Sequence, residues 1–278
     1  MSMKYSISKL CKLACVSRSG YYKWINRAED FSDRAKENKL IKELILEIHN
    51  KYRGTYGRKR ICIAINNILN FNVNHKRVYR LMKELNIKSV IRKKVYKRKF
   101  KPSSVADNIL NIDFSTNNPL QKLCMDITYI PIDKSARRFL YLNAVKDVFN
   151  GQIIAYDLSL RNDVKLVQNT LNKLSKMNLS ANCILHTDQG FQYTRREYSN
   201  FLKKIGVIQS TSRKANCWDN APIESFFSHL KSELIYLVNT TDVTELTRLI
   251  HEYIHFYNNE RIQNKIGMSP IEYLTHAA

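Results

Sequence analysis

Beyond about residue 118 the chain alternates between two kinds of segment, and the order of these segments limits the folds available to it. Residues 123–132, 138–149 and 152–160 show the alternating, β-branched pattern of strands. The dipeptide Asn150-Gly151 between the last two is typical of a hairpin turn. Three successive strands with short connections predict an antiparallel meander.

Helices and strands then alternate to the end of this region. Apolar residues recur at helical spacing in 164–177, 195–206 and 223–235, and strand-like segments lie between them at 183–188 and 207–212. The resulting order is β-β-β-α-β-α-β-α. It predicts an α/β protein of the ribonuclease-H-like fold, a mixed five-stranded sheet flanked by helices on both faces.

The N-terminal part is expected to be all-α. Residues 7–24 predict two short helices with a break at Ser17 to Gly20, a weak helix-turn-helix pattern. Three further helices are predicted at 36–51, 58–69 and 74–85.

The net charge of +22 at pH 7 predicts a polyanionic partner, because so positive a surface attracts polyanions at long range. Most of the excess lies in residues 1–110, which carry 27 Lys and Arg against 8 Asp and Glu. Double-stranded DNA is the expected partner of this part.

Segment 74–85 is the candidate DNA-recognition helix. Asn74 is a good N-cap, and Val78, Leu81 and Met82 would face the core. Any exposed helix face of a basic protein can look like this, so surface charge alone is the alternative. The basic residues expected to point outward are His75, Lys76, Arg77 and Arg80.

A basic linker follows this helix. Seven of the ten residues 92–101 are basic, and Tyr96 and Phe100 are interleaved among them. Such a run cannot form a core, so it is either solvated or lies along a phosphate backbone, and we favour the phosphate contact. The candidate contacts here are Lys93, Lys94, Lys97 and Arg98.

Three acids form the candidate catalytic site. Asp126 lies in the middle of the first predicted strand, Asp188 at the end of the fourth, and Glu224 at the start of a helix. Carboxylates that converge in this way can hold two magnesium or manganese ions for phosphodiester chemistry. Any single acid is weak evidence for a catalytic site, because most Asp and Glu residues are surface residues.

The motifs around these acids resemble those of a known family. Thirty-five residues separate Asp188 from Glu224. The chain is similar over nearly its whole length to the second-frame (OrfB) transposases of the bacterial insertion-sequence-three family, which share a D-D-35-E core with retroviral integrases. The matching motifs are DITY from Asp126, HTDQGFQY from His186, SRKANCWDNAPIESFF from Ser212, Lys231 with Glu233, and the tail Tyr253 to Tyr273.

The resemblance implies a reaction and the residues that perform it. The family nicks the terminal inverted repeats of its element and joins the freed 3′-hydroxyl to another DNA phosphodiester, with two Mg²⁺ ions that Mn²⁺ may replace. It implies a homo-oligomer on DNA and an upstream-frame product that supplies another helix-turn-helix and a leucine zipper. By this resemblance the catalytic and metal-binding groups are Asp126, Asp188 and Glu224. We add Arg213, Lys214 and Lys231 as candidate DNA contacts and Tyr193 and Asn220 as candidate shapers of the site, with surface charge or helix packing as the alternative for each.

Three positions depart from the family pattern. Ala215 stands where glycine is usual, Gln263 where histidine is frequent, and Leu123 where tryptophan is frequent. None of them is one of the three acids, so the departures bear on fine geometry or current activity and not on the class of protein.

These patterns predict an organisation into four regions. They are a helical DNA-binding region at 1–90, a basic linker at 91–117, a catalytic core at 118–240 and a helical tail on the core at 241–278. No apolar run is long enough to span a membrane, so we expect a cytoplasmic protein, and the resemblance implies that it is bacterial and nucleoid-associated. The six cysteines form no CxxC pair and are expected to be reduced and mostly buried, with Cys11 and Cys15 on one helix face.

Two alternatives remain open from the sequence. His251, Glu252 and His255 match the HExxH pattern of zinc proteases, although a helix packed on the core is the more economical interpretation. The chain could also be a non-catalytic or inactive DNA-binding protein derived from a transposase.

Overall fold

The structure is a computed structural model that divides the chain into two compact units, Met1–Val90 and Ile91–Ala278. In the described residues no helix is both long and apolar enough to cross a membrane. The residues described are 6–29, 33–69, 71–90, 114–133, 138–212 and 220–277.

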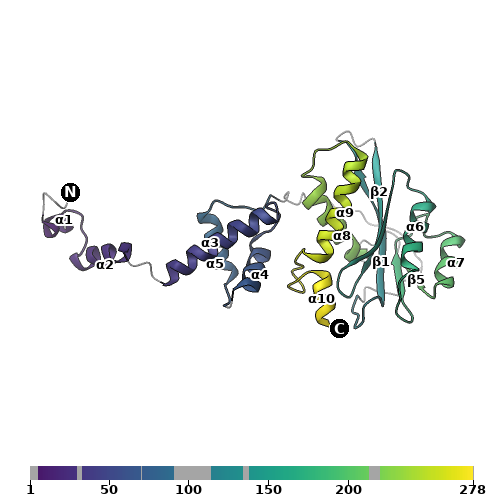
Figure 1. The fold of residues 1–278 in the computed structure, drawn as a ribbon, viewed down its shortest axis with the longest axis horizontal. Helices are drawn as coiled ribbons and strands as arrows, with labels where there is room; N and C mark the ends of the chain where they lie inside the picture. Colours follow the sequence, from purple (N-terminus) through teal and green to yellow (C-terminus); the bar gives the residue numbers. More distant parts are fainter. Residues whose placement is uncertain are drawn as a thin grey trace. The chain divides into compact units, whose positions relative to one another are not determined.

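The first unit is built from helices alone in its described residues (Figure 1). They are α1 (Ile7–Leu13), α2 (Arg18–Glu29), α3 (Asp33–Lys51), α4 (Arg58–Ile68) and α5 (His75–Glu84).

The break between the first two helices lies earlier than the sequence predicted. Helix α1 ends at Leu13, and the Ser17 Oγ accepts a hydrogen bond from the Gly20 backbone N at 3.0 Å, so Gly20 belongs to the first turn of α2. Serine is a strong N-cap, which explains why the helix begins beside it. The expectation that Cys11 and Cys15 share a helix face was wrong, because Cys15 lies beyond α1 with φ +54° and is exposed.

Helices α3, α4 and α5 pack around an apolar core. Helix α5 begins as predicted, because the Asn74 side chain accepts a hydrogen bond from the Lys76 backbone N at 2.8 Å. The buried side chains are Ile41, Ile45 and Ile48 of α3, Ile61 and Ile65 of α4, and Val78, Leu81 and Met82 of α5.

The second unit contains a five-stranded mixed sheet in the order β3-β2-β1-β4-β5. The first three strands form the predicted antiparallel meander, and β4 and β5 extend it in parallel from β1. The bounds of the strands are β1 Lys122–Pro131, β2 Phe139–Asp147, β3 Ile153–Ser159, β4 Ile184–Thr187 and β5 Ile208–Thr211.

The turn between β2 and β3 is the predicted Asn-Gly turn. Gly151 has φ +81°, a conformation that glycine adopts without strain. The side chain of Asn150 accepts a hydrogen bond from the Gln152 backbone N at 3.0 Å and donates one to the Pro270 carbonyl at 3.1 Å. The turn is thereby tied to the C-terminal helix.

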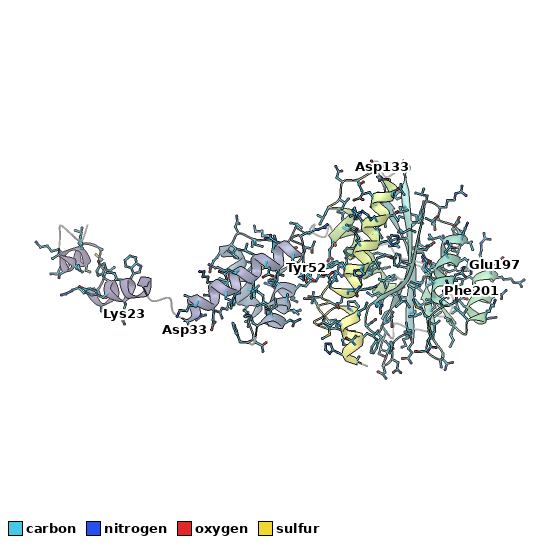
Figure 2. The ribbon with its side chains drawn as sticks, viewed as in Figure 1. Lys23, Asp33, Tyr52, Asp133, Glu197 and Phe201 are labelled. Atoms are coloured by element: carbon cyan, nitrogen blue, oxygen red, sulfur yellow. The ribbon has the colours of Figure 1, made fainter. Side chains whose placement is uncertain are left out.

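Helices cover both faces of the sheet (Figure 1). Helices α6 (Val164–Leu174) and α7 (Arg196–Lys204) lie on one face, and Glu197 of α7 is exposed to solvent (Figure 2). Helices α8 (Ala221–Leu230), α9 (Val243–Asn259) and α10 (Pro270–Ala277) lie on the other.

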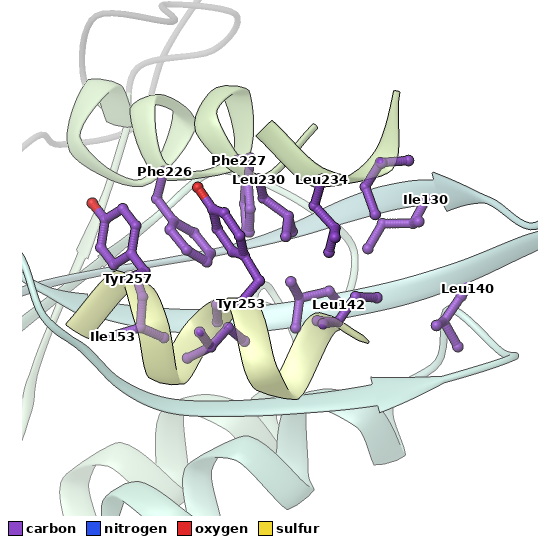
Figure 3. Close-up of a cluster of buried hydrophobic side chains, with 14 of the residues drawn as sticks. Ile130, Leu140, Leu142, Ile153, Phe226, Phe227, Leu230, Leu234, Tyr253 and Tyr257 are labelled. Carbon is purple, nitrogen blue, oxygen red and sulfur yellow. The ribbon is translucent and has the colours of Figure 1, made fainter. Parts of the chain in front are cut away.

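Each face has its own apolar core. The core under α8 and α9 combines strand residues with Phe226, Leu230 and Tyr257 (Figure 3). The core under α6 and α7 combines Met125 and Leu185 with the buried residues of those two helices.

The predicted helix 223–235 changes its winding near its end. Helix α8 stops at Leu230, and Lys231–Ile235 form a π-helical turn, η2, in which the Tyr236 backbone N donates to the Lys231 carbonyl at 2.9 Å. Apolar spacing is nearly the same for the two windings, so it could not predict this change.

Candidate active site

The two aspartates of the candidate site lie on neighbouring strands. Parallel β1 and β4 pair Lys122 with Ile184 and Cys124 with His186. Continuing this register by two residues brings Asp126 opposite Asp188, which directly follows β4. The sequence correctly placed Asp126 within the first strand and Asp188 at the end of the fourth, and the ribonuclease-H-like topology expected from the element order made these two strands neighbours.

Alternation along β1 decides which face Asp126 occupies. Cys124 and Ile130 belong to the core beneath α8 and α9, and successive even-numbered residues of a strand share one face. Asp126 therefore lies on the α8 face of the sheet. Glu224 lies in the first turn of α8, at the border of the helix face that Ile223 and Phe227 bury.

The loop after β4 holds Asp188 in place. The Asp188 Oδ1 accepts a hydrogen bond from the Gly190 backbone N at 2.8 Å, and a Cβ at position 190 would lie 3.0 Å from the same oxygen. The buried Tyr193 donates its hydroxyl to Asn143 Oδ1 at 3.3 Å. Gln192 Nε2 donates to Asn162 Oδ1 at 2.6 Å. The DQGFQY segment is thus anchored on both sides of its exposed Phe191.

The acids influence one another electrostatically. Burial, together with the charges of Asp188 and Glu224, raises the pKa of Asp126 to about 7, although a hydrogen bond from the Ile127 backbone N at 2.7 Å acts in the opposite direction. Partial burial also raises the pKa of Glu224. Asp188 and Glu224 are exposed, so both are accessible to a ligand.

The donor chemistry of this cluster suits a hard divalent cation. The charges of Asp188 and Glu224 raise the pKa of Asp126, and a cation bound beside these carboxylates would relieve that repulsion. In the described part of the chain, no three His, Cys, Asp or Glu side chains stand together closely enough to hold a metal as they are. The oxygen donors are therefore present, but in this structure they do not lie close enough together to coordinate one metal ion.

Lys231 lies on the same edge of the helix as Glu224, seven residues or about two turns further on. Burial lowers the pKa of Lys231, and the charge of Asp126 opposes that effect. Lys231, which the sequence had singled out, thus lies close enough to Asp126 for its charge to lower the pKa of that acid.

Family models cover most of the chain. Integrase core domain models match residues 116–217 and 224–277, and a helix-turn-helix-like domain model matches residues 35–95. The InsK protein of insertion sequence element IS150 from Escherichia coli K12 is 38% identical over 275 residues, which are 97% of this chain and 93% of that protein. The chain belongs to the IS3-family OrfB transposases.

The chain is also similar to other proteins. The transposase for insertion sequence element IS904 from Lactococcus lactis is 34% identical over 233 residues, 82% of this chain and 90% of that protein. The InsF transposase of IS3A from Escherichia coli K12 is 29% identical over 280 residues, 97% of this chain and 94% of that protein. The HTLV-2 integrase catalytic core domain, solved with magnesium, aligns with a TM-score of 0.44 and 16% identity over 55% of this chain and 95% of that chain.

The membership establishes several of the sequence predictions. The transposase has an integrase core with the ribonuclease-H-like arrangement, preceded by a helical, helix-turn-helix-like region, and DNA is its partner. Proteins with this core normally use a divalent metal.

The predicted recognition helix α5 exposes part of its basic face in this transposase. Lys76 and Arg80 are exposed, as is Tyr79. Arg77 differs from the prediction, because its guanidinium contacts Glu37 at 2.8 Å and Asn38 Oδ1 at 2.9 Å on α3. It is half-buried and connects two helices, so it does not point freely outward as expected, and its contact with DNA stays a proposal.

A groove of about 530 Å³ lies beside the same helix. The Tyr79 ring there lies between Arg58, at 5.2 Å, and Lys83, at 4.9 Å. Sequence reasoning missed Arg58 and Tyr79, although an aromatic residue among basic residues is a recognised signal of nucleic-acid binding.

Several predicted DNA contacts lie outside the described residues. They are Arg213 and Lys214, together with Lys93, Lys94, Lys97 and Arg98 of the sequence-predicted linker.

The HExxH match has an ordinary structural explanation. His251 Nδ1 lies 2.8 Å from the Tyr156 hydroxyl, and Glu252 pairs with Arg248 on the same helix. The first contact joins α9 to β3 and the second lies on the exposed side of α9, which agrees with a helix packed on the core.

Two buried cations near the site were not predicted. Lys146 of β2 and Arg261 just beyond α9 are both buried. A lysine inside an otherwise apolar strand, and an arginine in the YNNER segment, were the available signals.

Proposed function

We propose that this transposase nicks the terminal inverted repeats of an insertion sequence and joins the freed 3′-hydroxyl to another DNA phosphodiester. Asp126, Asp188 and Glu224 are assigned as its catalytic, metal-binding carboxylates. The observation that carries the proposal is the β1–β4 register, which aligns the two aspartates on the sheet face covered by α8.

The three carboxylates would hold two Mg²⁺ ions, which Mn²⁺ may replace. When bound, such ions activate the attacking oxygen and stabilise the leaving oxygen of a phosphodiester. Asp126 would give up its proton and present a carboxylate oxygen. The strand backbone holds this carboxylate in a fixed position. Asp188 and Glu224 present oxygens from the exposed side, where DNA can approach.

Basic residues would hold the DNA around this centre. Lys231 stands beside the acids and would contact a phosphate near the reacting bond. Lys76 and Arg80 on α5 would contact DNA away from the chemistry, with Arg58 and Tyr79 beside them. We propose the same role for Arg213, Lys214 and the basic linker. Only the charge of these residues supports it.

The proposal includes further protein partners. Joining two element ends in one reaction calls for a homo-oligomer on DNA. The family resemblance adds an upstream-frame product with its own helix-turn-helix and leucine zipper, fused to this chain or acting beside it.

A cleavage assay tests the proposed reaction. Full-length protein is incubated with Mg²⁺ or Mn²⁺ and a labelled duplex that carries the end of the parent element. We expect a nick that leaves a 3′-hydroxyl, followed by joining, and we expect Asp188→Asn to abolish both. Asp242→Asn is the matched control, because asparagine also caps a helix well and Asp242 only caps α9. Nicking that survives Asp188→Asn unchanged would refute the assignment of the acids.

A further inference from the structure

Glu224 stands on a helix that packs on the sheet mainly through apolar side chains. The α8 contacts in the core come from Ile223, Phe226, Phe227 and Leu230. Apolar contacts are non-directional, so by themselves they leave the helix some freedom to slide or rotate. A metal site tolerates little of this freedom, because its ligands must stay within about 0.5 Å of their working positions.

A buried amino group fixes the start of α8 to the sheet. Lys146 Nζ donates to the Pro222 carbonyl at 2.9 Å and lies 3.3 Å from the Tyr257 hydroxyl. Lys146 is paired with Cys124 across β1 and β2, and Asp126 is paired with Ala144 one step along the same face. The Lys146 side chain therefore connects the strand position next to Asp126 with the turn that carries Glu224.

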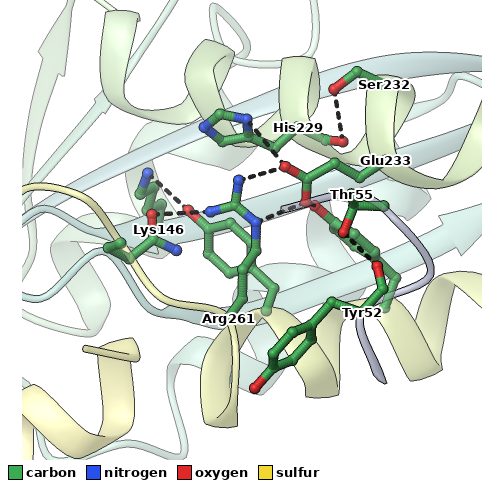
Figure 4. Close-up of polar contacts among 10 residues, drawn as sticks. Tyr52, Thr55, Lys146, His229, Ser232, Glu233 and Arg261 are labelled. Atoms are coloured by element: carbon green, nitrogen blue, oxygen red, sulfur yellow. Dashed lines mark hydrogen bonds and ion pairs between the residues drawn. The ribbon is translucent and has the colours of Figure 1, made fainter. Parts of the chain in front are cut away.

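A buried ion pair fixes the chain just beyond the other end of α8. Arg261 donates to both carboxylate oxygens of Glu233, at 2.6 and 2.7 Å, and Tyr253 donates its hydroxyl to Glu233 at 2.9 Å (Figure 4). Both charged side chains are almost fully buried. Glu233 lies in the π-helical turn η2, two residues after Lys231.

Tyr257 of α9 joins these two contacts. Lys146 reaches its hydroxyl, and the Arg261 guanidinium lies over its ring at 5.2 Å. We call the set Lys146, Glu233, Tyr257 and Arg261 the α8 clamp. Its hydrogen bonds are directional, and they act at the two ends of the segment that carries both Glu224 and Lys231.

We propose that Lys146 and Arg261 are positioning residues that set where α8 lies over the sheet, and thereby set the position of Glu224 relative to Asp126 and Asp188. The inference rests on the proposed catalytic role of Glu224. Buried polar groups in a packed interior can specify an arrangement even when they add little stability, and a clamp of this kind does so.

The variant Lys146→Met distinguishes a role of Lys146 in positioning α8 from a role in the stability of the fold. Methionine keeps most of the buried stem and removes the polar group whose burial is costly, so the melting temperature should equal or exceed that of the wild type. Without the bond to Pro222, α8 should move more freely. We expect amide hydrogen exchange in the first turns of α8 to become about tenfold faster in the metal-free protein, at a melting temperature no lower than that of the wild type.

Metal binding and chemistry supply the second readout. A misplacement of about 1 Å can cost on the order of a hundredfold in rate. We expect Lys146→Met to bind Mn²⁺ more weakly, measured by electron paramagnetic resonance of free Mn²⁺, and to lose about a hundredfold of Mg²⁺-dependent nicking while its affinity for DNA is kept. The loss should be smaller with Mn²⁺, because Mg²⁺ is the ion that demands near-ideal geometry.

Arg261→Lys tests the other end of the clamp, because lysine keeps the charge but cannot form the two-pronged contact with Glu233. The matched control is Arg248→Lys, an exposed arginine on α9 that pairs with Glu245 at 2.8 Å. The control Arg248→Lys should behave as wild type in every measurement.

The outcomes that would overturn the clamp are distinct from failure of the proposed function. Wild-type exchange rates in α8 of Lys146→Met would overturn it, as would activity lost only in proportion to a lower melting temperature. If the wild type itself neither binds Mn²⁺ nor cuts DNA, the proposed function fails. The exchange rates, measured without metal, still decide whether Lys146 holds α8.

Discussion

Burial and two neighbouring negative charges act together on the carboxylate of Asp126. They raise its pKa from about 4 to about 7, so the folded protein binds the proton of this residue more tightly than the unfolded chain does. The stabilisation from that proton is complete below about pH 4 and is lost as the pH rises through about 7.

This shift predicts how stability depends on pH. In metal-free buffer, the free energy of unfolding of the second unit should fall between about pH 4 and about pH 7, and Asp126→Asn should flatten that dependence. Urea denaturation with a chelator, at fixed ionic strength, measures it. Glu43→Gln, an exposed acid of the first unit, should keep the wild-type dependence. A wild-type dependence in Asp126→Asn would contradict the electrostatic account.

At the same scale, Lys76 offers a test of the DNA-binding face. Because its side chain is exposed and would neutralise one phosphate, Lys76→Ala should weaken binding to all DNA sequences about equally and lower the salt slope by about one. Fluorescence anisotropy across a salt series measures both quantities. Lys203→Ala, an exposed lysine on α7, is the control. An unchanged slope for Lys76→Ala would exclude this contact.

At the scale of secondary structure, Asn74 sets where α5 begins. Asn74→Ala removes the hydrogen bond to the Lys76 backbone N, and we expect the first unit to lose about 1 kcal/mol of stability. Thermal unfolding monitored by circular dichroism measures the loss. Asn72→Ala, an exposed neighbour before the helix, should have no such effect. Equal losses in the two variants would show that capping is not the cause.

The elements also show what sequence could and could not predict. The strands, the helices and their order along the chain followed from local patterns, because alternation and turn residues are local properties. The neighbouring places of Asp126 and Asp188 followed only from the fold that this order indicated. The Glu233–Arg261 pair was not predicted, because its partners lie 28 positions apart. For the same reason Arg77 was expected to point outward, since its partner on α3 is distant in the sequence.

At the scale of the whole molecule, the chain consists of two compact units with separate cores. We expect two unfolding transitions in the full-length protein. Phe226→Ala removes a fully buried ring from the core under α8. It should lower the free energy of unfolding of the second unit alone, by about 3–5 kcal/mol. Asn74→Ala should shift only the unfolding transition of the first unit. Calorimetry that shows one transition moved by both variants would contradict this independence.

The central claim is that Asp126, Asp188 and Glu224 hold the metal that drives DNA cleavage, and a change of ligand chemistry at one of them tests it most directly. Asp188→Cys replaces a hard oxygen donor by a soft thiolate, which suits Mg²⁺ poorly and Mn²⁺ better. We measure nicking of the element-end duplex in each metal, with Asp188→Asn as the control that no metal should restore. The account predicts that Asp188→Cys is inactive with Mg²⁺ and regains nicking with Mn²⁺. Wild-type nicking by Asp188→Cys with Mg²⁺ would contradict it.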